Sequence, residues 1–309
     1  MNMSEQHSLT PEHTDIRGTR SVNEPMSRHV SWRAGGTAAK FFKPANLDDL
    51  RGFLPTIPVD EPILFVGLGS NLLIRDGGFA GTVILTTPML GGITLDTNDT
   101  LIVIAGAGAA SPHVAKYAAK NNLAGAAWLA GVPGTVGGAL AMNAGCYGTQ
   151  TWEQVVDCVT VNRAGELHTR TAADFEIGYR HVVMKAPGEE FFVSARFRFR
   201  VGDADSAQTE IKALLAKRMA AQPLDKPNAG STFRNPPGDF AARLIESCGL
   251  KGFTIGGAQV SPKHANFIIN VGNASAADIE SLINHMKNTV REKTGVDLIQ
   301  EVKIFGAAA

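Results

Sequence analysis

The stretch between Lys120 and Glu153 constrains the fold most, because it holds no charged residue and many glycines; its centre reads GAAWLAGVPGTVGGALAMNAGCYG. A membrane-spanning helix would explain the missing charge, but lipid-facing helices tolerate the glycines, Pro133, Thr135 and Asn143 poorly. Glycine makes up 33 of 309 residues, above the usual share of about 7%, and it permits tight turns and close approach of the backbone to a ligand. We therefore expect no membrane span but backbone that lies against a ligand.

Composition narrows the classes of partner. Hydrophobic residues make up 44%, the formal net charge is zero and no block of Lys or Arg occurs, so the basic footprint of a nucleic-acid-binding protein is missing. We expect a small-molecule ligand and a monomer. The cysteines, Cys146, Cys158 and Cys248, form no CxxC pair, which indicates neither disulfides nor a metal site and favours the reducing cytoplasm. Residues 1–27 lack the apolar segment of a secretory signal, and we expect a poorly ordered extension.

Hydrophobic periodicity divides the rest of the chain in two. Residues 28–202 are expected to be mixed α/β with short strands, in subdomains of about 28–90 and 91–202. Residues 203–306 are expected to be a separate α+β unit. Its predicted elements are helices over 206–222, 239–250 and 275–295, a strand over 265–272 and a closing strand over 296–305.

Local signals place several elements of the first part. Asn46 is predicted to cap a short helix over residues 47–54. In PILFVGLGSNLLIRDGGFAGTVILTT, three strands are separated by two glycine turns. A later strand is followed by a helix that we expect to begin with Ser111 as N-cap and Pro112 at its first position. Ala164–Gly165 indicate the turn of a hairpin.

Three glycine-rich segments suggest phosphate binding to different degrees. GAGAAS resembles a dinucleotide fingerprint, but Ser111 replaces its third glycine and no acid lies about 20 residues downstream. GVPGTVGGA, residues 131–139, lacks the Gly-Lys-Ser/Thr of a P-loop. Its backbone N–H groups, and those of GLGSN at residues 67–71, can still hold a pyrophosphate. Each loop alone is more often an ordinary turn, but together they indicate one large phosphate-bearing cofactor held by backbone.

Five motifs in order carry a family resemblance. They are VGLGSNLLIRDGGFAGTVI, LAGVPGTVGGALAMNAGCYG, GYR, AGSTFRNP and QEVKIFG, and they span about residues 28–306. In this order and spacing the chain resembles the UDP-N-acetylenolpyruvoylglucosamine reductases, the MurB family. The resemblance implies an α+β protein: a two-subdomain, mixed α/β FAD-binding fold of the vanillyl-alcohol oxidase (PCMH) type, followed by a C-terminal α+β substrate-binding domain.

The family reaction implies two cofactors. NADPH reduces FAD, and the flavin passes a hydride to the enolpyruvyl ether of UDP-N-acetylglucosamine, giving UDP-N-acetylmuramate for peptidoglycan synthesis. Covalent flavoproteins of the wider superfamily often carry a histidine after the glycine turn, whereas this chain has Ser70–Asn71, so we expect noncovalent FAD. The residues expected to bind it are Gly67, Leu68, Gly69, Ser70, Asn71, Leu72, Gly131, Pro133, Gly134, Thr135, Gly138, Asn143 and Gly145.

The resemblance also implies a catalytic set. Ser231 matches the family's proton donor, because a carbanion beside the substrate carboxylate is basic enough to take a proton from a neutral hydroxyl. Arg180 would hold that carboxylate and offset enolate charge. Glu301 would stabilise the polarised intermediate or orient a proton relay. Without the motifs, these residues would be a turn serine, a surface arginine and an edge-strand acid.

Further residues are expected to bind the substrate, each with a structural alternative. By the resemblance they are Tyr179, Arg218, Asn235, His264 and Lys303. Tyr179 could equally be packing, and a lone histidine such as His264 is more often structural. The segment between Val201 and Asn228 is too short for the long insertion of the enterobacterial enzymes, so the chain resembles the type II members.

Two other functions stay open at this level. One is a noncovalent FAD oxidase or dehydrogenase of the same superfamily with another substrate, in which Ser231 would not act as an acid. The other is a nucleotide-binding module without redox chemistry, which would stay colourless when mixed with FAD.

Overall fold

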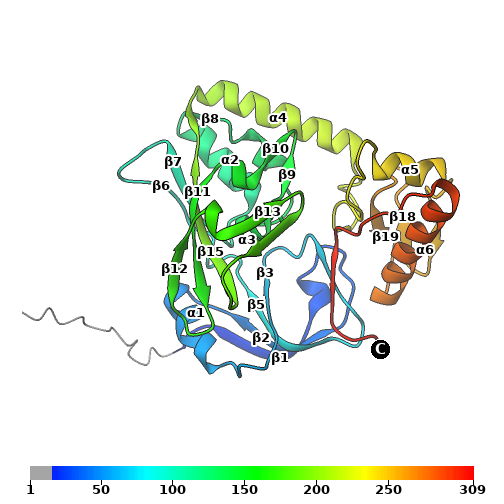
Figure 1. The fold of residues 1–309 in the computed structure, drawn as a ribbon, viewed down its shortest axis with the longest axis horizontal. Coiled ribbons are helices and arrows are strands. Elements are labelled where there is room, and N and C mark those ends of the chain that lie inside the picture. The colour runs from blue at the N-terminus through cyan, green and yellow to red at the C-terminus, as the bar shows by residue number, and fades with distance from the viewer. Residues whose placement is uncertain (1–15) are drawn as a thin grey trace, which may run out of the picture.

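A four-stranded sheet forms the base of the molecule in the computed structural model, which describes residues 16–309 (Figure 1). Its strand order is β1-β2-β5-β3, with β5 parallel to both of its neighbours. The run FAGTVIL suits this central place, because most of its side chains are buried. The bounds in this region are β1 (Thr19–Pro25), β2 (Thr37–Lys43), α1 (Leu47–Phe53), β3 (Ile63–Val66), β4 (Leu72–Ile74) and β5 (Phe79–Leu85).

A second, antiparallel sheet has the order β12-β11-β15-β7-β6. Its core includes the buried face of the neighbouring helices and extends to Ala207 and Ile211 of α4. The elements of this region are β6 (Ile93–Leu95), β7 (Ile102–Gly106), α2 (Ser111–Lys120), β8 (Leu123–Ala124), α3 (Val136–Met142), β9 (Gly145–Cys146), β10 (Thr149–Gln150), β11 (Val155–Asn162), β12 (Leu167–Arg170), β13 (Phe175–Gly178), β14 (His181–Met184), β15 (Glu190–Arg198), β16 (Arg200–Val201) and α4 (Ala204–Ala221). In Figure 1, α4 runs along the top of the molecule from this region toward the C-terminal one.

The C-terminal region packs two helices on a small sheet of order β17-β18-β19. Arg75, in the turn after β4, holds this region by donating from Nε and Nη2 to Glu280 of α6 at 2.9 and 2.8 Å. Asp76 accepts hydrogen bonds from the first amides of α6. The bounds are α5 (Ala241–Ser247), β17 (Thr254–Ile255), β18 (Ala258–Val260), β19 (Ile268–Asn270), α6 (Ala276–Thr294) and β20 (Lys303–Phe305).

Several local predictions are confirmed. The side chain of Asn46 accepts a hydrogen bond from the amide of Asp49 at the start of α1. A capping box at Ser275 opens α6, and Gly295 ends it in the left-handed conformation. The hairpin of β11 and β12 turns at Gly165, where φ is +78°.

Three predictions are wrong in detail. Residues 1–15 lie outside the described residues, but residues 19–25 of the predicted loose extension form β1 along β2; this edge strand is mostly exposed and therefore shows no apolar alternation. Ala110, not Ser111, is the N-cap of α2, and the Ser111 hydroxyl is buried inside the first turn. The closing strand shrinks to β20, which pairs in parallel with β4 rather than within the C-terminal region.

Two properties bear on the class of protein. Within residues 16–309, no helix is both long and apolar enough to cross a bilayer. Cys146, Cys158 and Cys248 are all free thiols. The domain limits predicted from sequence stay a prediction.

Candidate active site

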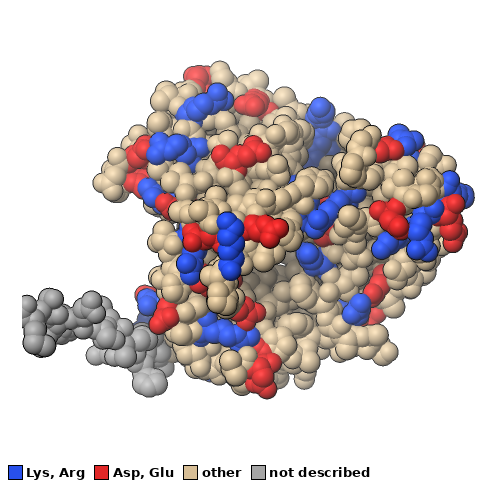
Figure 2. Space-filling view, viewed as in Figure 1, with Lys and Arg blue, Asp and Glu red and all other residues tan. Residues whose placement is uncertain are grey.

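A single large cavity collects most of the predicted site residues. Its volume is about 890 Å³, at the upper end of the range for ligand pockets and suited to a dinucleotide rather than a metabolite. Figure 2 shows the recess in the middle of one face, with blue Lys and Arg side chains near its rim. The predicted cofactor ligands that line it are Gly67, Leu68, Gly69, Ser70, Asn71, Leu72, Gly131, Pro133, Gly134, Thr135, Gly138 and Gly145.

The two glycine loops pack directly against each other. A Cβ atom built on Gly67 would lie 2.3 Å from Thr135 Oγ1, and one built on Gly134 would lie 2.5 Å from Ser70 Oγ. Both contacts are closer than real Cβ atoms allow. Thr135 presents three atoms to Gly67, so the first loop needs glycine there. At Gly134 only the rotatable hydroxyl of Ser70 is close, and the φ of +98° favours glycine instead. Gly67 and Gly134 were predicted to let a ligand approach the backbone, and in the structure they lie where the two loops contact each other. Gly138 differs, since the nearest atom to its Cβ position is 3.9 Å away.

Hydrogen bonding distinguishes the loops as possible phosphate sites. The amides of Val136 and Gly137, in the second loop, already donate to the carbonyls of Ala109 and Ala107 at 2.9 Å. By contrast, within residues 16–309 the amides of residues 67–71 donate no hydrogen bond, although they lie on the cavity. Successive free amides at a turn form a concave anion site. Within residues 16–309 the amides of Gly134 and Thr135 in the second loop also donate no hydrogen bond, so the first loop differs in offering the longer run of free amides for the pyrophosphate of a dinucleotide.

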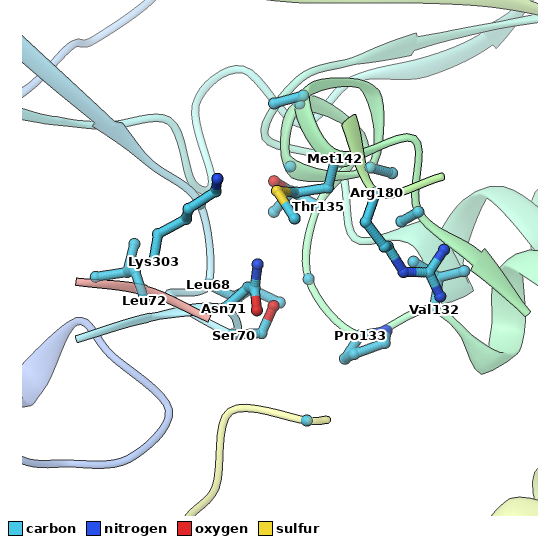
Figure 3. Close-up of a pocket in the computed structure, with 18 of the residues that line it drawn as sticks. Leu68, Ser70, Asn71, Leu72, Val132, Pro133, Thr135, Met142, Arg180 and Lys303 are labelled. Atoms are coloured by element: carbon cyan, nitrogen blue, oxygen red, sulfur yellow. The ribbon is translucent and has the colours of Figure 1, made fainter. Parts of the chain in front are cut away.

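Arg180 and Glu301 form an ion pair in the cavity wall. Arg180 Nε donates to Glu301 Oε1 at 2.9 Å, and both side chains are less than one-fifth exposed. The other end of the guanidinium donates to the carbonyl oxygens of Asn143 at 3.3 Å and Gly145 at 3.0 Å. Because a guanidinium has five N–H donors, two have no acceptor within residues 16–309 and are available to a ligand carboxylate. Figure 3 shows Arg180 across the pocket from Lys303, with Ser70 and Asn71 between them.

Glu301 is an acid within a mostly apolar segment, residues 296–305, and its side chain faces the cavity. Its neighbour Gln300 turns away and donates to the carbonyl of Val302, while Glu301 lines the cavity. Burial raises the pKa of the Glu301 carboxyl, and the adjacent charge of Arg180 opposes that rise. The Glu301 carboxyl is therefore a desolvated acid in the cavity wall whose ionised form is stabilised by Arg180.

Ser231 reaches the cavity from a loop that its neighbours hold rigidly. Gly230 has a φ of +75°, which bends the chain just before the serine. Buried Asn266 accepts from the amide of Phe233 at 3.0 Å and donates to its carbonyl at 2.8 Å. The carbonyl of Asn266 also accepts from the amide of Thr232 at 2.8 Å. Asn266 was missed in the sequence, because an asparagine before a strand carries no distinctive signal.

Two further cations face the cavity. Arg218, near the end of α4, donates to Gln222 at 2.9 Å, and burial lowers its pKa. Among the described residues, no carboxylate is one of its charged neighbours. A desolvated and uncompensated guanidinium favours an anionic ligand. Lys303 belongs to β20, and its amide donates to the carbonyl of Asn71 at 3.0 Å.

Four predicted site residues do not line the cavity. Asn143 is buried in the left-handed conformation and donates to Gln150 at 3.0 Å and to Gly178 at 3.1 Å. Its place is behind the wall, where its carbonyl supports Arg180. Tyr179 points outward and is 47% exposed, with Arg180 Cζ at 5.0 Å from its ring centre.

Asn235 and His264 have structural contacts instead. Asn235 Oδ1 accepts from the amide of Ala241 at the start of α5 at 3.1 Å. The His264 ring packs edge-on against Phe267 at 4.8 Å, and burial lowers its pKa. Phe267 lines the cavity, whereas His264, which packs against it, does not.

Comparisons with known proteins follow this division of the chain. Residues 38–170 match the model of an FAD binding domain, and residues 222–305 match the C-terminal domain of UDP-N-acetylenolpyruvoylglucosamine reductase. The reductase of that name from Thiobacillus denitrificans is 53% identical over 302 residues, covering 94% of this chain and 93% of that protein. The one from Legionella pneumophila (strain Lens) is 54% identical over 296 residues, covering 96% and 95%. The crystal structure of MurB from Thermus caldophilus superimposes with a TM-score of 0.76 at 28% identity, covering 94% and 100%.

The fold and the cavity therefore define a flavoprotein oxidoreductase: an FAD-binding domain joined to a distinct C-terminal domain. The predicted fold class is confirmed. The chain belongs to the UDP-N-acetylenolpyruvoylglucosamine reductase family, as its five sequence motifs indicate.

Proposed function

We propose that this chain is the flavoenzyme that reduces the enolpyruvyl ether of UDP-N-acetylglucosamine to UDP-N-acetylmuramate with NADPH. One observation carries the proposal: Ser231, Arg180 and Glu301, from three separate segments, meet at the same cavity as both glycine loops. A phosphate site, a carboxylate site and a proton donor in one cavity meet the needs of this reaction.

The binding roles follow from the wall of the cavity. Residues 67–71 would hold the FAD pyrophosphate through their free amides, without covalent attachment. The guanidinium of Arg218, which has no carboxylate partner among the described residues, and the ammonium of Lys303 would bind the anionic parts of the ligands. Bound FAD supplies the hydride, taken from NADPH, for the vinyl carbon of the enolpyruvyl group.

Three side chains would then stabilise the negative charge that develops on the substrate and supply its proton. Arg180 has two N–H donors free for the substrate carboxylate, where negative charge grows as the enolate forms. Glu301 holds the guanidinium in position from its other side. Ser231 would transfer its hydroxyl proton to the carbon beside the carboxylate.

The test is flavin absorbance under anaerobic conditions. Purified protein loaded with FAD is mixed with NADPH, and the flavin is expected to bleach. Adding the enolpyruvyl substrate should restore the colour, whereas other sugar nucleotides should not. Failure to recolour with that substrate, together with rapid reoxidation by oxygen, would instead indicate an oxidase of the same superfamily. Protein that stays colourless with FAD would exclude all flavin chemistry.

A further inference from the structure

Arg180 occupies a backbone conformation that its residue type disfavours. It is the second of two residues in the turn that joins β13 to β14, where Gly178 pairs with His181. Its φ is +55°, in the left-handed region that favours glycine or asparagine. Such a residue persists only where its surroundings hold it, and these residues cluster at functional sites.

Arg234 supplies a hold on that turn from the loop that carries Ser231. Its Nη2 donates to the carbonyl of Arg180 at 2.9 Å, and its Nη1 donates to the carbonyl of Tyr179 at 3.4 Å. The fork of a guanidinium suits two successive carbonyls, which an ammonium cannot engage in the same way. The backbone of the turn is therefore fixed independently of the Arg180 side chain.

The backbone of Arg234 fixes a third segment. Its amide donates to the carbonyl of Ile299 at 2.8 Å, and the amide of Glu301 donates to Thr232 at 2.9 Å. The chain that bears Ser231 and the chain that bears Glu301 thus lie side by side at this point. Arg234 contacts both of them and the turn of Arg180, in addition to the ion pair that links Glu301 to Arg180.

Charge adds a second effect. Arg234 places a cation near Glu301 in addition to Arg180, and both charges oppose the rise in the Glu301 pKa that burial causes. Its Nε is buried and, within residues 16–309, has no acceptor. The guanidinium is thus partly desolvated, which costs free energy that its contacts with the turn must offset.

We propose that Arg234 is a positioning residue that clamps the strained Arg180 turn to the Ser231 loop and so keeps the carboxylate-binding guanidinium aligned with the proton donor. This inference rests on the proposed function. While the substrate carboxylate binds the remaining N–H donors of Arg180, the backbone clamp keeps the turn in place. Arg234 itself need not touch the substrate.

The first test does not depend on catalysis. Arg234→Met keeps the apolar stem but removes both donors and the charge. Arg243→Met is the control, because within residues 16–309 that exposed arginine pairs only with nearby Asp239. Amide hydrogen exchange in the turn between Gly178 and His181 should quicken at least about tenfold in Arg234→Met and stay unchanged in the control. An unchanged exchange rate in Arg234→Met overturns the clamp.

The second test separates positioning from general damage. Flavin reduction by NADPH should stay within about twofold in Arg234→Met, while recolouring by the enolpyruvyl substrate should slow about tenfold or more. Arg234→Lys, which keeps the charge without the fork, should recover only part of the recolouring rate and serves if Arg234→Met fails to fold. Equal slowing of both half-reactions, or full recovery in Arg234→Lys, contradicts the proposal. If the wild-type chain does not reduce the ether, the proposed function fails, whereas the exchange test still decides on the clamp.

Discussion

The Nε atom of Arg180 lies 2.9 Å from Oε1 of Glu301, although 121 residues separate them. The pair joins the turn of β13 and β14 to the segment that leads into β20. Both groups are largely buried, so removal of either one leaves a charge without its partner in a poorly hydrated place.

This pair should be energetically coupled. Arg180→Met and Glu301→Leu are each expected to lower the free energy of unfolding by about 3 kcal/mol, because each strands the other charge. The double variant should lose at least about 1 kcal/mol less than the sum of the two. Urea unfolding of all four proteins measures the coupling. Additive losses would show that the two groups do not interact.

The ionisation of Glu301 should also affect stability in a defined direction. Because its pKa in the folded state is raised above 4.5, the folded protein holds this proton more tightly than the unfolded chain. The contribution to stability is therefore present below about pH 4.5 and is lost as the pH rises through the folded pKa. The free energy of unfolding of the wild type, minus that of Glu301→Gln, should fall across this interval. A flat difference would contradict the raised pKa.

The contact between the glycine loops makes a steric prediction. Gly67→Ala places a methyl group against the Oγ1, Cγ2 and Cβ atoms of Thr135, so rotation of the threonine cannot relieve the clash. We expect a loss of about 1–3 kcal/mol in stability without cofactor. Thr135→Ala in the same chain should recover part of it. Gly92→Ala is the matched control, because no atom lies within 4 Å of its added Cβ, and it should be nearly neutral.

Ser231→Ala tests the proposed role of this serine as proton donor. Bleaching of the flavin by NADPH should be unaffected, while recolouring by the substrate should slow by about 10²-fold, as expected for loss of a general acid. Ser247→Ala should change neither step, because this exposed serine of α5 donates only to its own helix among the residues that the structure describes. Equal recolouring rates in Ser231→Ala and the wild type would remove this hydroxyl from the mechanism.

Asn266→Asp tests the hold on the Ser231 loop. The amide nitrogen that donates to the carbonyl of Phe233 becomes an oxygen, so two acceptors face each other in a buried place. We expect a loss of at least about 2 kcal/mol in the free energy of unfolding. Asn288→Asp on the exposed face of α6 should change it by less than about 0.5 kcal/mol. Thermal unfolding of both variants provides the comparison.

Much of the fold could be predicted because its signals are local. The caps of α1 and α6, the hairpin of β11 and β12 and the glycine turns around β4 all depend on neighbouring residues. The parallel pairing of β20 with β4 could not be foreseen, since two three-residue strands so far apart carry no shared pattern. An exposed edge strand such as β1 could not be predicted either, because it shows no alternation of apolar and polar residues.

The site residues were predicted through motifs, and not all of them line the cavity. Ser231, Arg180 and Glu301 do meet, but Asn143 and Asn235 use their amides to hold backbone, which asparagine does as readily as it binds ligands. The positive φ of Arg180 has no signal in sequence, because arginine rarely adopts it. The contacts of Arg234 and Asn266 exist only once distant segments are folded together.

The late position of β20 bears on how such a protein is made. Both Glu301 and Lys303 belong to the segment that ends by pairing with β4, whose residues leave the ribosome far earlier. Contacts between residues so distant in sequence close slowly, because a long loop must be ordered first. During synthesis the four-stranded sheet can form while β20, the strand that pairs with β4, is still missing. Glu301 and Lys303 therefore take their places in the cavity wall only after the elements that precede them in the chain have been made.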